Sequence, residues 1–432
     1  MDFNEKNTQQ QVKKYSFLLI ILCWIVYACS YIGKLGYTAN IIQIEKAFSV
    51  SHSESGTVSS FFFFTYGAGQ IINGIFCKKY NIKYVVFFGL ILSGLSNLLI
   101  SVISNFAFVK YIWILNGGAL SVLWTSLIRF LSETLDEKYT AKAVVIMGTT
   151  VATGTFIVYG LSSLFVALNV FKLIFLVAGF LLPTIAVIWL VSSPKLAKLL
   201  KSLNQNDRIK TNGENQTLPT KDKKALGGLK GLGLLLVIFA IYSVMTNLIK
   251  DGLTTWVPTV LNEAYGLPDY ASILLTLLLP LCAIFGVLVV TVMHKKIKSF
   301  ISICALSFAI SCALIGAVIG TINLNSFVVT VVSFALVSCL TSGINNVLTS
   351  MIPLYWKNKI NSGLLAGVLN GFCYVGSTIS SYGLGSVADK WGWNSVFWLL
   401  FSLCLIASAI GLIEWLARII TTKKNKNSVD VS

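Results

Sequence analysis

Two lysines stand at matching positions inside long apolar segments of this sequence. Residues 34–39 read Lys-Leu-Gly-Tyr-Thr-Ala and residues 250–255 read Lys-Asp-Gly-Leu-Thr-Thr, so the copies lie half the length of the 432-residue chain apart. A lysine within hydrocarbon costs about 2.5 to 3.5 kcal/mol on insertion scales, so a matched pair indicates a function. We expect Lys34 and Lys250 to face each other across a central cavity and to hold an anion.

The elements that carry these lysines are predicted from composition. The chain is 56% hydrophobic and 11% charged, with a mean hydropathy of +0.80, which describes an integral membrane protein. Runs of about 20 apolar residues predict an all-α membrane protein with twelve transmembrane helices. The predicted helices cover residues 16–41, 55–77, 84–104, 107–132, 143–168, 171–193, 232–257, 271–293, 299–321, 326–350, 362–387 and 394–418.

The repeat divides these helices into two pseudo-symmetric six-helix bundles. We assign residues 1–193 to the first bundle, 194–230 to a flexible cytoplasmic linker, 231–420 to the second bundle and 421–432 to a cytoplasmic tail. The linker is polar and rich in Lys, Asn, Gln and Gly. Two related halves joined in this way are typical of a secondary transporter whose site lies between them near the bilayer midplane.

The distribution of Lys and Arg sets the orientation of the helices. With the N-terminus in the cytoplasm, only Lys46, Lys110, Lys172 and Lys390 fall in outer loops. This bias predicts a multi-pass protein of the plasma membrane with both termini cytoplasmic. The net charge of +17 then reflects cytoplasmic anchoring to membrane lipid, and nucleic-acid binding is not expected.

Side chains for catalysis or metal binding are scarce. The chain has two histidines, His52 and His294, and its nine cysteines form no Cys-x-x-Cys pair. These residues supply too few side chains for the ligands of a His-based metal site or for a Ser-His-Asp catalytic arrangement. We therefore expect no catalytic residue, no metal and no cofactor, and we predict a monomer.

The loop between the second and third predicted helices carries a family motif. Residues 74–83 read Gly-Ile-Phe-Cys-Lys-Lys-Tyr-Asn-Ile-Lys, which resembles the G-x-x-x-D-R-x-G-x-R motif of the major facilitator superfamily. The resemblance implies the major facilitator fold. Lys78 replaces the acidic residue of the motif, so this loop either gates by a different charge pattern or anchors to lipid head groups.

The first helix of each half is similar to those of organophosphate:phosphate antiporters, the glycerol-3-phosphate and hexose-phosphate transporters. Residues 27–37 resemble the pattern Y-x-x-x-Y-x-x-R-K-x-F, and residues 248–259 resemble L-R-Y-G-x-x-D-W-x-P-T. Lys34 and Lys250 stand at the two arginines of that family. Further matches are Trp124, Arg129, Gly363, Gly367, Tyr374, Gly376, Asp389, Gly392 and Trp393. The resemblance implies exchange of a phosphate ester for phosphate at a site containing both lysines.

Several departures from that family dilute the positive charge of the expected site. Gln70 stands where the family has a lysine, and Val151 stands where it has a histidine. Lysine in place of arginine also removes the planar fork that grips two phosphate oxygens. Asp251 tunes the charge, because Lys34, Lys250 and Asp251 together leave about +1. This total favours a monoanion, a carboxylate or a zwitterion with a phosphate arm over a dianionic sugar phosphate.

The expected contacts each have a structural alternative. The tyrosines can be core aromatics with satisfied hydroxyls, and Lys34 can extend toward the outer interface. Lys250 can pair with Asp251, although neighbours on a helix point about 100° apart, which makes the pair geometrically poor. The expected substrate contacts are Lys34, Lys250, Tyr27, Tyr31, Tyr66, Gln70 and Tyr374.

Four other charged residues are predicted to have structural or gating roles. Arg129 precedes Glu133 by about one turn, which favours a structural salt bridge near the cytoplasmic end of the fourth helix. Lys78 lies in the motif loop, and Asp389 belongs to the matches at the end of the eleventh helix.

These observations predict a transporter of a small anionic solute, with phosphate as a possible counter-substrate. An anion that neutralises both lysines lowers the barrier to rocking between the two open states, so exchange is expected to exceed net leak. Two alternatives remain: a proton-coupled symporter that uses Asp251 as its proton carrier, and a phosphate-ester sensor that binds its ligand and transports it poorly.

Overall fold

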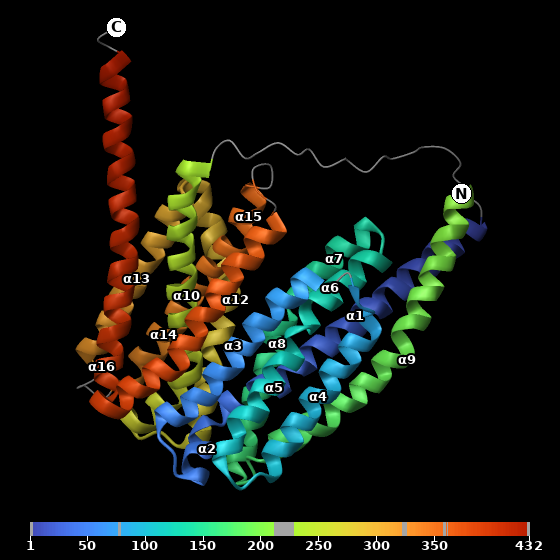
Figure 1. Cartoon of the computed structure of the whole chain (residues 1–432), viewed down its shortest axis with the longest axis horizontal. Helices are drawn as coiled ribbons and strands as arrows, with labels where there is room; N and C mark the ends of the chain where they lie inside the picture. The colour runs from blue at the N-terminus through green and yellow to red at the C-terminus, as the bar shows by residue number, and fades with distance from the viewer. Residues whose placement is uncertain are drawn as a thin grey trace.

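The computed structural model describes residues 3–76, 79–210, 229–321, 326–356, 360 and 362–429, and every regular element within these ranges is helical. The first half contains α1 (Phe3–Ala39), α2 (Ile41–Phe48), α3 (His52–Phe76), α4 (Ile82–Val102), η2 (Phe106–Phe108), α5 (Val109–Ser121), α6 (Leu123–Thr134), α7 (Glu137–Gly148), α8 (Thr150–Ala167) and α9 (Leu173–Lys210). The second half contains α10 (Leu229–Tyr265), α11 (Asp269–Thr276), α12 (Leu278–Lys296), α13 (Phe300–Thr321), α14 (Phe327–Asn346), η4 (Val347–Met351), α15 (Ile352–Tyr355) and α16 (Ser362–Val429). Figure 1 shows the two halves as separate bundles.

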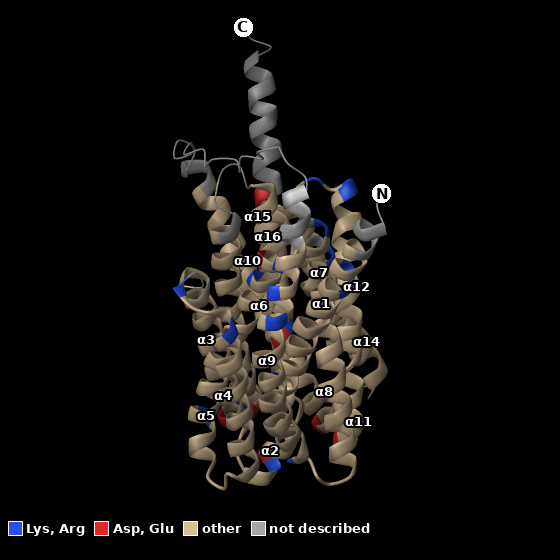
Figure 2. Cartoon of the chain, turned by 90° about the vertical axis from the view of Figure 1, so that its right-hand side faces the viewer, with Lys and Arg blue, Asp and Glu red and all other residues tan. Residues whose placement is uncertain are grey.

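The predicted helices correspond to these elements. Ten helical stretches of the described residues are long and apolar enough to cross a membrane. One of the ten, within α16, contains two predicted helices, because Gly392 breaks α16 with a φ of 73° that favours glycine. The remaining predicted helix is α3, which has 25 residues and is less apolar because it is rich in serine and glycine. Figure 2 shows most of the helical length without charged residues, as lipid contact requires.

The two halves repeat the same packing. In the first half α4 packs on α9 and α3 on α5, and in the second half α13 packs on α16 and α12 on α14. Between the halves, α3 packs along α16 and α8 packs on α11. The fold is therefore the predicted pair of pseudo-symmetric bundles. The bundles meet along two seams, one between α3 and α16 and the other between α8 and α11.

The helices that flank the linker are longer than the apolar pattern predicts. The sixth helix was expected to end at residue 193, but α9 continues to Lys210 with Pro194 inside it. Lys and Leu, which favour helix, follow this proline, so the helix persists after the apolar run ends. Only 211–228 of the predicted linker lies outside the described residues. Similarly, α16 continues to Val429, through most of the predicted tail.

Candidate functional site

The two matched lysines share one cavity between the halves. The cavity has a volume of about 260 Å³, and its wall is built from α1, α3, α8, α10, α12, α14 and α16. Lys34 enters it from α1 and Lys250 from α10, as the half-chain repeat predicts. Tyr31, Tyr374 and Asp251 also line the wall. An anion in this cavity would contact both halves at once.

Lys34 is held by aromatic rings. Its Nζ lies 4.1 Å from the ring centroid of Tyr66 and 5.3 Å from that of Tyr31. The Tyr66 ring in turn packs on the Tyr374 ring of the other half, with centroids 5.2 Å apart. A ring face attracts an ammonium group without neutralising it, so Lys34 keeps its charge available for an anion. Tyr66 therefore supports Lys34 from behind, because Tyr66 does not line the cavity.

Lys250 and Asp251 are closer than the helix geometry predicts. Lys250 Nζ lies 3.4 Å from Asp251 Oδ1, although consecutive side chains leave the helix in different directions. The flexible four-carbon stem of lysine allows its head group to bend back toward the neighbouring residue. Asp251 also accepts a hydrogen bond of 2.5 Å from Ser377 Oγ and one of 3.4 Å from Asn247 Nδ2.

Amide side chains also belong to the polar wall, together with threonine and serine hydroxyls, and the sequence motifs gave no indication of these amides. Asn345 Nδ2 donates to Asn247 Oδ1 at 2.7 Å, and both residues line the cavity together with Asn370. Asn370 Nδ2 donates to Gln70 Oε1 across the halves at 2.8 Å. Because polar amides are costly inside apolar helices, their presence in the predicted helices was the signal that could have identified them.

Besides Tyr66, two expected contacts do not line this cavity. Tyr27 is buried, and its ring packs on Tyr31 and Trp124 with centroids 5.6 and 4.8 Å away. Gln70 lines a second, larger cavity of about 570 Å³ whose wall is mostly apolar and includes Trp124 and Asn370. Val151, which replaces the family histidine, does line the central cavity.

Three of the charged residues expected to have structural or gating roles do not line the central cavity: Arg129, Glu133 and Asp389. Arg129 Nε contacts Glu133 Oε1 at 2.6 Å, the pairing that their spacing suggests. Asp389, from α16, accepts hydrogen bonds from the backbone N–H groups of His52 at 3.1 Å and Ser53 at 2.8 Å at the start of α3. Lys78 lies outside the described residues.

The halves are joined at the end of the bundle that carries α2, here called the α2 end. Lys46 Nζ contacts Asp269 Oδ2 at 2.7 Å there, and Ser60 Oγ donates to the Thr378 carbonyl at 2.6 Å. Toward the opposite end, the second cavity lies beyond the Gln70–Asn370 contact, and the bundles diverge (Figure 1). The structure is therefore closed at the α2 end.

The sequence of this chain is similar to those of a probable transport protein and of a membrane sensor. The chain is 19% identical over 427 residues to the "Probable hexose phosphate transport protein" of Chlamydia trachomatis, covering 94% of this chain and 92% of that one. It is also 26% identical to the "Membrane sensor protein UhpC" of Escherichia coli over 99 residues, which span only 23% of either chain.

Solved structures share the fold at low sequence identity. The chain superposes on a peptide transporter, POT, in complex with sulfate with a TM-score of 0.73 and 12% identity, covering 91% of this chain and 93% of that one. It superposes on a bacterial homologue of the human lysosomal transporter Spinster with a TM-score of 0.69 and 12% identity, covering 92% and 96%. Residues 23–353 match the Major Facilitator Superfamily, so the chain belongs to the major facilitator superfamily of membrane transporters.

Proposed function

We propose that this protein is a secondary active transporter that exchanges a small organic anion for phosphate or another anion by alternating access. The observation that carries the proposal is that Lys34 and Lys250, from opposite halves, line the same cavity. The full-length similarity to a protein named as a probable hexose phosphate transporter supports a phosphate ester as the organic anion. In the plasma membrane, the α2 end would face outward and both termini the cytoplasm, because the outer-loop lysines Lys46 and Lys390 lie near that end.

The charge of the cavity favours a singly charged substrate. Two ammonium groups and the Asp251 carboxylate give the wall a formal charge of about +1. A monoanion would neutralise it, whereas a dianion would leave a net negative charge in a poorly solvated cavity. The amides of Asn247, Asn345 and Asn370 can hydrogen-bond uncharged hydroxyls of the same substrate.

Exchange is tested by uptake of labelled phosphate into proteoliposomes. Uptake into vesicles preloaded with phosphate is expected to exceed uptake into empty vesicles by at least about tenfold, because unpaired lysines oppose closure around an empty site. Equal uptake into loaded and empty vesicles would contradict exchange. Proton symport would instead be established if an imposed pH gradient drives uptake into empty vesicles and Asp251→Asn abolishes that uptake.

Neutralising Asp251 is expected to change the charge preference of the cavity. Asp251→Asn raises the formal charge of the wall to about +2 and keeps a hydrogen-bonding group beside Ser377 and Asn247. A dianionic sugar phosphate should then compete with phosphate about tenfold better relative to a monoanionic ester, since nearby unit charges interact by about 1 to 4 kcal/mol. The ratio of inhibition by the dianionic sugar phosphate to inhibition by the monoanionic ester, measured at one pH, checks this prediction. Ser377→Ala, which leaves the charge of the wall unchanged, is the matched control. An unchanged ratio would contradict the charge argument.

A further inference from the structure

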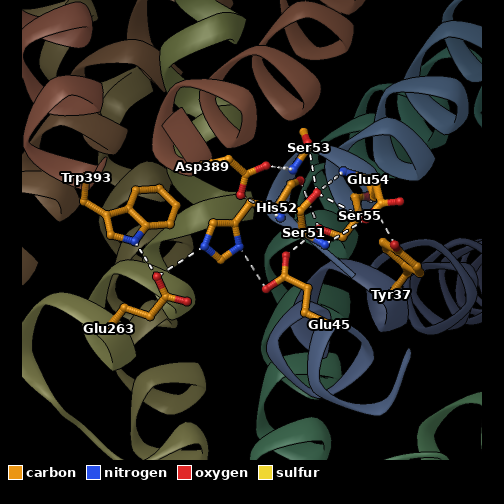
Figure 3. A network of polar contacts seen from close by, with 10 residues as sticks. All are labelled: Tyr37, Glu45, Ser51, His52, Ser53, Glu54, Ser55, Glu263, Asp389 and Trp393. Carbon is orange, nitrogen blue, oxygen red and sulfur yellow. Dashed lines mark hydrogen bonds and ion pairs between the residues drawn. The ribbon is translucent and has the colours of Figure 1, made fainter. Parts of the chain in front are cut away.

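A histidine lies between carboxylates of the two halves at the α2 end. His52 is the first residue of α3, and its Nε2 lies 3.2 Å from Glu263 Oε2 on α10. Its Nδ1 lies 3.1 Å from Glu45 Oε2 on α2, an ion-pair contact rather than an aligned hydrogen bond. Figure 3 shows the imidazole with one carboxylate on each side. The ring therefore bridges the first half, which contains Glu45, and the second half, which contains Glu263.

The surroundings of His52 fix this arrangement. Trp393 Nε1 donates to the same Glu263 oxygen at 2.8 Å, which orients that carboxylate toward the ring. The rings of Trp256 and Trp393 flank the imidazole, with centroids 5.6 and 5.3 Å away, and only 17% of the His52 side chain is exposed. Asp389 of α16 accepts a hydrogen bond from the backbone N–H of His52. Two carboxylates of the second half therefore face this residue, Glu263 from α10 and Asp389 from α16.

The charged groups around His52 are mostly acidic. Glu45, Glu263 and Asp389 face it from α2, α10 and α16, and Glu54 of its own helix is bonded to Ser51. Two cations of this end have other contacts: Lys46 pairs with Asp269 of α11, and Lys390 Nζ lies 6.0 Å from the Trp391 ring centroid. Among the ion pairs of the described residues, none joins a lysine or arginine to Glu45, Glu263 or Asp389.

The two ring contacts require a particular protonation state. A neutral imidazole has one N–H, so one ring nitrogen would present a lone pair to a carboxylate. An imidazolium has two N–H groups and can face Glu45 and Glu263 favourably at the same time. The closed geometry is therefore complementary to protonated His52.

We propose that His52 is a proton-binding site that couples protonation to closure of the α2 end, whatever solute the central cavity carries. When the α2 end is closed, the imidazolium joins Glu45 of one half to Glu263 of the other. Opening this end moves α10 and α16 away from α3, so the His52 ring loses Glu263 and the His52 backbone loses Asp389, while the ring keeps Glu45. The proton then leaves to water at the α2 end, and closure takes one up from the same side. Opening is consequently favoured by high pH on that side.

The pH range of this coupling follows from the pKa of His52 in the closed state. Burial alone would lower this pKa, but the contacts with Glu263 and Glu45 outweigh it and raise the pKa to about 10. An open state that loses Glu263 and exposes the ring to water, while Glu45 stays beside it, would have a pKa that falls toward the ordinary 6.5. The stabilisation of the closed state is thus complete below about pH 6.5 and is lost as the pH rises toward 10. Within this window the closed-to-open ratio can fall by up to about tenfold per pH unit.

The coupling is tested by measuring the distance across the α2 end as a function of pH. Spin labels at Ala47→Cys and Asn394→Cys, two exposed positions on opposite halves, report the distance by double electron–electron resonance. The nine native cysteines are replaced by serine or alanine so that only the two introduced cysteines are labelled, and no substrate is added. Between pH 6 and pH 9, the population with the longer distance is expected to rise at least about tenfold relative to the shorter one.

Variants of the network separate the proton site from a structural contact. His52→Gln cannot be protonated, so the long-distance population should be high and independent of pH. Glu263→Gln removes one carboxylate and should move the transition to lower pH. Lys46→Gln removes the neighbouring ion pair with Asp269 and should weaken closure equally at every pH. A wild-type distribution that does not respond to pH, or a response that persists in His52→Gln, would overturn the proposal.

Discussion

Alanine at Lys34 or at Lys250 is expected to reduce phosphate exchange on the order of 100-fold, the largest loss that a single substitution in the cavity should cause. Removing one partner of a desolvated charge pair costs about 2 to 5 kcal/mol, and each 1.4 kcal/mol corresponds to tenfold. Both substitutions should have similar effects, because the lysines face the same cavity from opposite halves. Initial rates into phosphate-loaded proteoliposomes, normalised to reconstituted protein, measure the loss.

Two controls make this prediction specific. Lys110→Ala removes a lysine that also lies over an aromatic ring, with Nζ 5.0 Å from the Tyr111 centroid, but that does not line the cavity, so exchange should be unaffected. Lys34→Arg keeps the charge and adds the planar fork that binds two phosphate oxygens, so exchange should survive. Retention of exchange in either alanine variant would show that the anion binds elsewhere.

The lysines could be predicted from sequence because their cost is local. A charge inside an apolar helix is unfavourable wherever the neighbouring helices lie, so Lys34 and Lys250 are conspicuous without a structure. The helices are predictable for a similar reason, since an apolar run of about 20 residues is set by the bilayer alone. Helix ends beyond the bilayer lack this constraint, and α9 accordingly extends through Pro194 to Lys210.

The remainder of the site depends on contacts between distant segments. Asn345 and Ser377 match no motif. Asn345 lines the wall and Ser377 bonds to Asp251 only because α14 and α16 pack against α10. Gln70 was expected beside the lysines from its motif position, but its contact with Asn370 places it on the second cavity. Sequence identifies which side chains are polar within the helices, and tertiary packing decides which cavity each of them lines.

The same reasoning applies to the α2 end. His52 and Glu263 are separated by 211 residues and belong to different halves, so the sequence showed only an isolated histidine. Asp389 was predicted to have a gating or structural role from a motif match, and its contacts with the backbone of His52 and Ser53 place it on the seam between the halves. These contacts join the two halves, so separation of the halves at this end would break them, and we expect them to bear on gating more than on the stability of either half.

Two glycines offer a direct comparison of contacts between the halves and contacts within one half. A Cβ at Gly56 would lie 2.2 Å from the Ser381 carbonyl oxygen, across the seam between α3 and α16. A Cβ at Gly376 would lie 2.1 Å from the Val244 carbonyl oxygen, between α16 and α10 of the same half. Both distances are too short for any side chain, and both obstacles are backbone atoms.

Alanine at these two positions is therefore expected to have different consequences. Overpacking costs about 1 to 3 kcal/mol, or roughly 5- to 150-fold in an equilibrium. In Gly56→Ala the halves can separate at the α2 end, so the protein should stay folded, show the longer Ala47–Asn394 label distance and lose exchange. In Gly376→Ala the helices of one bundle cannot separate without unfolding it, so the midpoint of thermal unfolding in detergent should fall.

The two measurements together decide whether the halves move as separate bodies. Gly160→Ala is the matched control, because no atom lies within 4 Å of its added Cβ, and neither the label distance nor the unfolding midpoint should change. If Gly56→Ala lowers the unfolding midpoint as much as Gly376→Ala does and leaves the label distance unchanged, the α3–α16 seam is part of a single rigid core. Alternating access through this seam requires the opposite result, because a seam that opens must be weaker than the packing within each bundle.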